Sequence, residues 1–159
     1  MKKPKIYLDT SVISHLDQTN HPDWTTDTIR LLEKIEKGEY YAVTSDVALI
    51  ELRRCPDEKY KKLMGFVERM KPEILELDDV VARVADKFIE MGVLKDENLE
   101  DCQHLAFALL NECDYIVSWN FRHIVNVKTQ KGVRVISALE DKVEVRICVP
   151  TFLVEGDDD

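Results

Sequence analysis

The stretch KIYLDTSVI, residues 5–13, joins a short apolar segment to an aspartate and then to a second apolar run. Residues 5–8 have the length and composition of a buried strand, and DTSVISHLD (9–17) is typical of a short helix that follows it. A strand that ends on an acid and turns into a helix is expected in a parallel α/β sheet, where ligands bind at the carboxyl ends of the strands. The stretch therefore predicts the first unit of such a fold, with Asp9 at its binding edge.

The rest of the chain repeats this alternation of strand and helix. Further strands are predicted at 40–44 (YYAVT), 73–77 (EILEL), 115–118 (YIVS), 133–136 (VRVI) and, at an edge, 143–149 (VEVRICV). Helices are predicted at 24–37, from Ser45 or Asp46 through Glu51, at 57–70, 78–93 and 99–111, and over NFRHIVNVKTQ (120–130), which Gly132 ends. This alternation predicts a three-layer α/β/α fold, with a central parallel sheet of four to five strands between helices.

The composition indicates an ordinary globular protein of one domain. The chain has 159 residues, of which 45% are hydrophobic and 33% charged, and its formal net charge is −9. Such acidity excludes a protein that coats nucleic acid with a uniformly basic surface, but it leaves room for a local basic patch beside a metal ion. We expect the domain to span residues 1–155 and the acidic tail, 156–159, to be disordered.

The four cysteines lack the spacing of a zinc site, so we expect free thiols in a reducing compartment. Asp9 interrupts the first apolar run before it reaches the length of a signal-peptide core. No stretch of the sequence is long and apolar enough to span a membrane. These features predict a cytoplasmic protein with no membrane partner.

Four polar residues fall at places where a parallel sheet would gather them. Asp9 and Asn120 directly follow predicted strands, Glu51 lies almost two turns into the helix after the second strand, and Asp101 lies in the first turn of the helix before the fourth. If the first and fourth strands are neighbours, the four side chains face one crevice. Carboxylate and amide oxygens are hard ligands that suit Mg²⁺ or Mn²⁺, and such an ion can lower the pKa of a bound water and neutralise charge on a phosphate.

Each of these residues also has a structural explanation. Asp9 can cap the helix that begins at Thr10, and Asn120 can cap the helix predicted after it. Glu51 can be a solvated charge on an amphipathic helix. Asp101 lies where the helix dipole favours an acid. Taken together, one acid or amide at each strand–helix junction favours a site over four separate structural roles.

Four motifs together resemble the PIN-domain family, and most of all the VapC-type toxin ribonucleases of type II toxin–antitoxin systems. They are YLDTSVI (7–13), SDVALIELRR (45–54), DCQHLAFA (101–108) and YIVSWNFRHI (115–124), so the resemblance covers nearly all of the chain. It implies a PIN-like α/β/α fold and an endoribonuclease that depends on Mg²⁺ or Mn²⁺ and leaves a 5′-phosphate and a 3′-hydroxyl. It implies as partners an RNA substrate, a cognate antitoxin protein and a second copy of the chain in a homodimer.

The resemblance also implies roles for single residues. Asp9, Glu51 and Asp101 would bind the metal as catalytic acids. Asn120 would take the fourth position, which is often Asp in the family, so the site carries one negative charge fewer. Ser11 would hydrogen-bond within the same site.

Other residues near the motifs are candidates for supporting roles. Glu97 precedes Asp101 by four residues, so we expect both on one helical face, where Glu97 would assist the metal site. His104, one turn after Asp101, is expected to pack or hydrogen-bond rather than bind metal, because hard oxygen sites rarely recruit imidazole. The candidates for contacts with RNA phosphates, each equally explained as a solvated charge, are Arg53, Arg54, Arg122 and His123.

Two other functions compete with a ribonuclease. One is a non-catalytic binding module that keeps the scaffold but has a metal site weakened by Asn120. The other is an α/β phosphatase with an aspartate nucleophile. Such an enzyme needs a second acid two residues after the first, and that position is Ser11.

Overall fold

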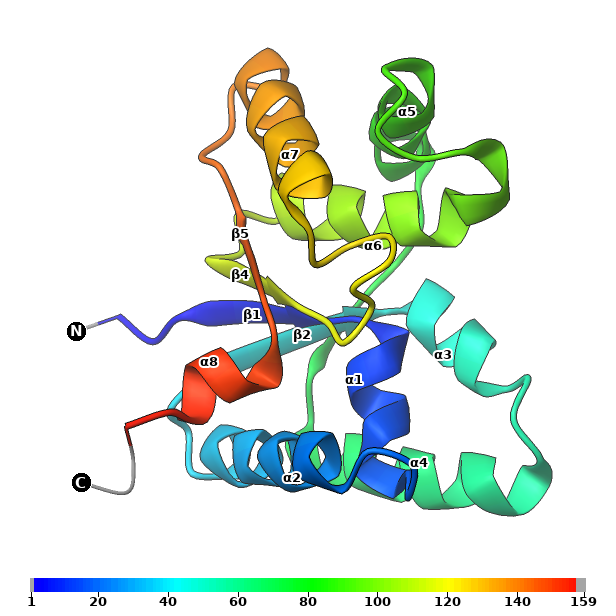
Figure 1. The fold of residues 1–159 in the computed structure, drawn as a ribbon, viewed down its shortest axis with the longest axis vertical. Coiled ribbons are helices and arrows are strands. Elements are labelled where there is room, and N and C mark those ends of the chain that lie inside the picture. Colours follow the sequence, from blue (N-terminus) through cyan, green and yellow to red (C-terminus); the bar gives the residue numbers. More distant parts are fainter. Residues whose placement is uncertain (1, 157–159) are drawn as a thin grey trace.

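The computed structural model describes residues 2–156, and within them one parallel sheet forms the centre of the molecule (Figure 1). Its strands, in chain order, are β1 (Lys5–Leu8), β2 (Tyr41–Ser45), β3 (Glu73–Leu75), β4 (Tyr115–Val117) and β5 (Arg146–Cys148). The order across the sheet is β3-β2-β1-β4-β5. The central strand β1 pairs with β4, and Leu8 lies opposite Val117, so the first and fourth predicted strands are neighbours.

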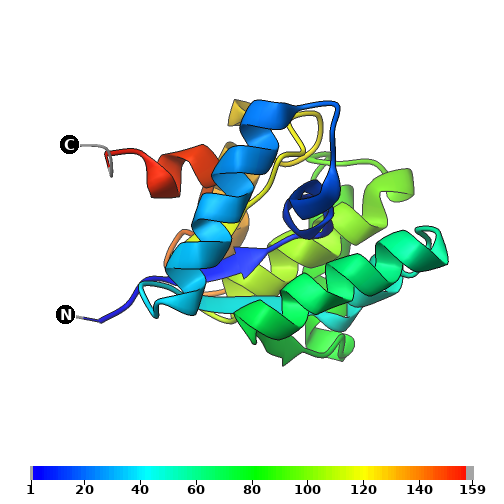
Figure 2. The ribbon, with the colours of Figure 1, turned by 90° about the horizontal axis from the view of Figure 1, so that it is seen from below.

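Helices cover both faces of this sheet, which confirms the predicted three-layer α/β/α fold. They are α1 (Thr10–Ser14), the 3₁₀ turn η1 (His15–Asp17), α2 (Pro22–Glu36), α3 (Asp46–Leu52), α4 (Asp57–Met70), α5 (Asp79–Glu90), the 3₁₀ turn η2 (Asp96–Asn98), α6 (Leu99–Leu110), α7 (Val127–Leu139) and α8 (Pro150–Val154). Helices α5, α6 and α7 lie on one face, and α1, α2, α4 and α8 lie on the other (Figures 1 and 2). Among the described residues, no helix combines the length and the apolar character that crossing a membrane requires.

Two hydrophobic cores, one on each face of the sheet, hold the layers together. Phe88 of α5 and Phe107 of α6 belong to the first core and are fully buried, and Tyr7 of β1 packs against Phe107 with ring centroids 6.0 Å apart. Leu31 and Leu32 of α2 belong to the second core. Because alternate residues of a strand face opposite sides of the sheet, β1 contributes side chains to both cores. Asp9 follows directly at the carboxyl end of β1.

The predicted strand at 133–136 is wrong, because these residues lie inside α7. Asn126 caps this helix by accepting a hydrogen bond from the Thr129 N–H (2.8 Å), so α7 begins later than the predicted helix at 120–130. Val133 and Ile136 are both buried, and their separation of three residues places them on one face of a helix. Gly132 lies within α7 instead of ending a helix: a Cβ there would be 2.6 Å from the Val93 Cγ2, so close packing explains the glycine.

The C-terminal part of the chain follows the prediction in part. The edge strand expected at 143–149 is confirmed as the shorter β5, and α8, which begins at Pro150, was not predicted. Most of the acidic tail that was expected to be disordered, residues 157–159, lies outside the described residues.

Candidate active site

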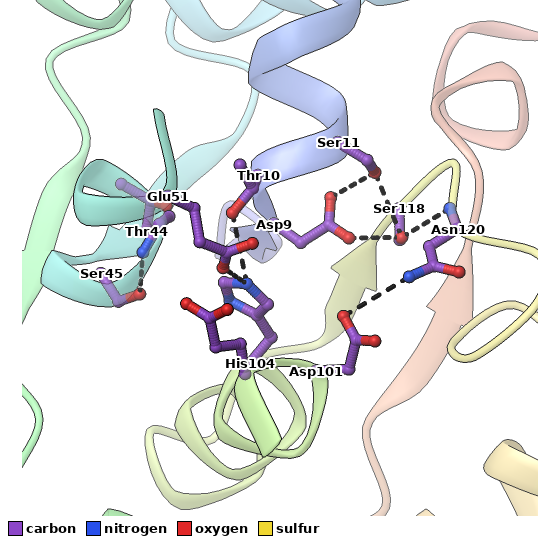
Figure 3. A network of polar contacts seen from close by, with 12 residues as sticks. Asp9, Thr10, Ser11, Thr44, Ser45, Glu51, Asp101, His104, Ser118 and Asn120 are labelled. Carbon is purple, nitrogen blue, oxygen red and sulfur yellow. Dashed lines mark hydrogen bonds and ion pairs between the residues drawn. The ribbon is translucent and has the colours of Figure 1, made fainter. Parts of the chain in front are cut away.

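Two hydroxyl groups hold the carboxylate of Asp9 at the carboxyl end of β1 (Figure 3). Its Oδ1 accepts hydrogen bonds from the Val12 N–H (3.1 Å) and the Ser11 hydroxyl (2.7 Å), and its Oδ2 accepts a short one from Ser118 at the end of β4. The side chain is buried, and this burial raises the pKa of the Asp9 carboxyl, although the charge of His104 and these hydrogen bonds act in the opposite direction. Asp9 therefore does cap α1, but capping alone does not explain a buried carboxylate.

The same two hydroxyls tie the start of α1 to the chain that leaves β4. The Ser11 Oγ accepts a hydrogen bond from the Trp119 N–H (2.9 Å), and the Ser118 Oγ accepts one from the Asn120 N–H (2.9 Å). Ser11 thus makes the hydrogen bond expected of it. Ser118 was missed as a site residue, because its place at the end of YIVS indicates only a buried strand residue.

Asp101 reaches the same region from the first turn of α6. Its Oδ2 lies 3.1 Å from the His123 Nδ1, and its side chain is 18% exposed. Burial raises the pKa of the Asp101 carboxyl; the charges of His104 and His123 lower this pKa, and those of Asp9 and Glu51 raise it. The three acids lie around His104 (Figure 3), and the charges of Asp9 and Glu51 therefore disfavour ionisation of Asp101.

Asn120 turns its NH₂ group, and not its oxygen, toward Asp101. The Asn120 Oδ1 accepts a hydrogen bond from the His123 N–H (3.0 Å), and this backbone donor fixes which end of the amide is the oxygen. The Nδ2 then lies 3.4 Å from the Asp101 Oδ1. Asn120 does not cap a helix, since turns follow it up to Asn126. Because an amide NH₂ has no lone pair for a metal, Asn120 in this orientation positions Asp101 and does not present the oxygen ligand that was expected of it.

Glu51, which is partly exposed, forms an ion pair with the buried His104. The Glu51 Oε1 lies 2.6 Å from the His104 Nε2, and His104 is 1% exposed. Burial lowers the pKa of His104, but the hydrogen bond and charge of Glu51, together with Asp9 and Asp101, outweigh burial and raise it. Burial likewise raises the pKa of Glu51, and His104 outweighs it, so this pKa is lowered. The two directions agree on a charged pair, and Glu51 is therefore not the solvated charge considered as an alternative.

The other nitrogen of His104 anchors the ion pair to the sheet. The Tyr7 hydroxyl lies 2.7 Å from the His104 Nδ1 and 2.7 Å from the Ser45 Oγ. Burial raises the pKa of Tyr7 well above its ordinary value, so the phenol stays neutral and can donate to Ser45 while it accepts from a protonated His104. His104 is thus a hydrogen-bonding residue, as expected. Tyr7 and Ser45 were missed, since both have the pattern of ordinary strand residues.

The donor set fits a hydrated divalent ion better than a closed cage. Within residues 2–156, no three His, Cys, Asp or Glu side chains are arranged as ready metal ligands. The reason lies in the pairings: Glu51 faces His104, and Asn120 presents its NH₂ group. Asp9 and Asp101 remain, and Mg²⁺ is commonly held by one or two carboxylates while it keeps several waters.

Two of the arginines expected to contact phosphate are engaged elsewhere. Arg54 forms a bidentate ion pair with Glu100 (2.8 and 3.0 Å), which joins the end of α3 to the first turn of α6. The Arg53 guanidinium lies over the Tyr60 ring, 5.1 Å from its centroid. Both arginines thus stabilise the scaffold around α3, and the charge of Arg54 also contributes to lowering the pKa of Glu51.

The other two phosphate candidates line one pocket next to the site. His123 contacts the Asp101 carboxylate, and Arg122 is exposed on the wall of this pocket. Glu97 lines the same pocket, but it lies in η2 and not on α6, so it does not share a helical face with Asp101 as expected. The described residues give Glu97 no hydrogen bond or ion pair in the acid cluster.

An aromatic stack joins α2 to the segment that follows β4. The rings of Trp24 and Trp119 are parallel, with centroids 4.7 Å apart, and His21 stacks on the outer face of Trp24 at 3.9 Å. The Trp119 Nε1 donates to the Thr28 hydroxyl (2.9 Å), which fixes the residue between Ser118 and Asn120. The four cysteines, elsewhere in the fold, are free thiols as expected.

No protein-family model matches this chain, and no curated protein is significantly similar to it. The fold and site define a parallel α/β protein with a buried aspartate at the carboxyl end of its central strand and two further acids, from α3 and α6, beside it. Any functional conclusion therefore depends on the residues themselves.

Proposed function

We propose that this protein is a metal-dependent endoribonuclease that hydrolyses RNA phosphodiester bonds with Mg²⁺ or Mn²⁺. One observation carries the proposal: the buried Asp9 and the partly buried Asp101 lie in one cluster of acids (Figure 3), and the pKa of each is raised. Burying carboxylates together costs free energy unless a cation joins them. His104 supplies a buried positive charge to the three acids of this cluster, and a bound cation would relieve the repulsion that is left between them.

Asp9 and Asp101 would hold the metal ion in this proposal. When bound, a divalent ion lowers the pKa of a coordinated water and neutralises charge that develops on a phosphate. Ser11 and Ser118 keep Asp9 oriented by donating to its two oxygens. Asn120 orients Asp101 from the other side.

Glu51 would orient the attacking water. Its pKa is lowered by His104, so it is ionised at neutral pH and accepts hydrogen bonds. A carboxylate with a lowered pKa is a poor base, because the best proton acceptors have a pKa near the working pH. We therefore expect Glu51 to orient the water by a hydrogen bond and not to act as the general base that accepts the water's proton.

Cleavage of a single-stranded RNA with and without Mg²⁺ tests the proposal. We expect Asp9→Asn and Asp101→Asn to lower the cleavage rate at least about 10²-fold, since each removes a group that acts at the reaction centre. Asp57→Asn is the matched control, because Asp57 is also an acid in the first turn of a helix, α4. Cleavage by both site variants at the parent rate would disprove the assignment.

A non-catalytic binding module is the second candidate, and the pairing of Glu51 with His104 and the orientation of Asn120 favour it. A titration with Mn²⁺ separates the two functions. A chain that binds no divalent ion at millimolar concentration fits the module, and one that binds it and loses binding in Asp9→Asn fits the nuclease.

The resemblance in four motifs supports a narrower proposal, that the ribonuclease is the toxin of a type II toxin–antitoxin pair. Its partners would be an antitoxin protein and a second copy of the chain. Expression in a bacterial host tests this role, since the parent should arrest growth and Asp9→Asn should not. Normal growth with active enzyme present would rule out toxicity.

A further inference from the structure

A pocket of about 380 Å³ adjoins the candidate active site. Its walls come from residues 92–98, which connect α5 to α6, and from residues 122–129, which lead into α7. His123 lines the pocket and also contacts the Asp101 carboxylate through its Nδ1 (3.1 Å). One imidazole ring therefore links the pocket to an acid of the site.

Positive charge dominates the lining of this pocket. Lys95, Arg122 and Lys128 are exposed there, and within residues 2–156 none of the three forms an ion pair. Other arginines hold carboxylates, as Arg83 holds Glu140 at 2.9 Å. Glu97 is the one acid that the described residues contribute to the lining. Three unpaired cations thus face one acid in a chain with a net charge of −9.

The loop that carries Arg122 is held in place before any ligand arrives. The Asn126 Nδ2 donates to the backbone carbonyls of Phe121 and Arg122 (3.2 Å each). The buried Thr129 donates its hydroxyl proton to the His123 carbonyl (2.7 Å). A fixed loop loses little conformational entropy when a ligand binds, so the backbone that carries Arg122 is pre-organised.

We propose that this pocket binds a backbone phosphate of single-stranded RNA next to the phosphate that is cleaved. The inference rests on the proposed ribonuclease function and names a substrate contact for it. A cluster of acids repels a polyanion, so RNA needs a nearby concave region of positive charge in order to approach. Arginine matches the geometry of a phosphate with its planar fork, and lysines add point charges.

Fluorescence anisotropy of a labelled single-stranded RNA tests the pocket in EDTA, where metal-dependent cleavage cannot occur. We expect the double variant Arg122→Gln/Lys128→Gln to bind RNA about tenfold more weakly than the parent. The slope of log K against log salt should become less steep by about 0.7 for each lost phosphate contact. The matched control is Lys37→Gln/Lys61→Gln, which removes two exposed positive charges from α4 and the end of α2, on the opposite face of the sheet.

Two further arms separate the possible outcomes. Inorganic phosphate should compete only weakly with RNA, and an acidic peptide of equal charge should not compete; displacement by the peptide at lower concentration than by RNA would overturn the proposal. Equal binding by parent and pocket variant, or equal losses in pocket and control variants, would also overturn it. Failure of the ribonuclease function looks different: the parent would bind RNA in EDTA through the pocket and still not cleave it with Mg²⁺.

Discussion

At the scale of single residues, the orientation of one amide decides what the fourth corner of the site can do. The Asn120 oxygen is taken by the His123 N–H, and the NH₂ group faces Asp101. The sequence identifies Asn120 as the fourth polar residue, but it does not reveal whether the amide oxygen or the NH₂ group faces Asp101. That choice depends on a turn at 120–123 that the helical pattern of NFRHIVNVKTQ concealed.

Asn120→Asp should lower the stability of the metal-free protein and raise its affinity for a divalent ion. The new carboxylate can still accept from His123, but it faces Asp101 with a like charge, which should destabilise the metal-free protein by about 1 kcal/mol. Mn²⁺ should then raise the melting temperature more in the variant than in the parent. Thermal unfolding with EDTA and with Mn²⁺ measures both effects, and Asn20→Asp in an exposed loop is the control. Equal shifts by Mn²⁺ in parent and variant would argue against a metal at Asp101.

His104→Gln should destabilise the protein strongly unless a divalent ion is present. Glutamine keeps a donor for Glu51 but removes the buried positive charge that faces three acids, which should cost about 3 kcal/mol at neutral pH. Mg²⁺ should recover a large part of this loss by supplying positive charge to the same cluster. Urea unfolding in EDTA and in Mg²⁺ measures the difference, with the exposed His21 changed to Gln as the control. A loss of stability that Mg²⁺ leaves unchanged would separate His104 from the metal site.

At the scale of elements, ion pairs at the helix ends fix how the layers meet. Arg83 and Lys87 of α5 both bind Glu140, the C-cap residue of α7, and these bonds lower the pKa of Glu140 to about 2. Arg54 joins α3 to α6 in the same manner through Glu100. Helices that border the site and its pocket are thus connected by charges at their ends, besides the apolar contacts beneath them.

Glu140→Gln should lower the free energy of unfolding at neutral pH, and the difference from the parent should disappear in acid. The carboxylate has a pKa of about 2 in the folded protein and about 4.3 in an unfolded chain. Its contribution is therefore complete above the unfolded pKa and declines as the pH falls toward the folded one. Because solvent screens a pair at the surface, we expect a cost of about 1 kcal/mol at pH 7. Urea unfolding from pH 7 to 2 should show the two proteins converging, and a constant difference would contradict the assignment.

At the scale of the whole molecule, the sequence predicts the architecture better than the site. Alternating strands and helices identify the sheet, and they predict that Asp9 and Asp101 converge if the first and fourth strands are neighbours, a condition that β1 and β4 meet. The helix at 133–136 escapes prediction since its β-branched residues favour a strand, and packing of Gly132 against Val93 overrides that preference. Partners such as Ser118 for Asp9 come from distant segments, so no local pattern could reveal them.

The stacked pair of Trp24 and Trp119 gives this chain an optical signature of its own. They are the two tryptophans of the sequence, and their indoles lie parallel at 4.7 Å, close enough for their electronic transitions to couple. Trp119 stands between Ser118 and Asn120, whereas Trp24 belongs to α2. The near-ultraviolet circular dichroism should therefore carry an exciton band that changes when the 118–126 segment shifts against α2. Binding of a ligand next to Asp9 that shifts this segment could then be followed by circular dichroism of the unlabelled protein, without any chromophore on the ligand.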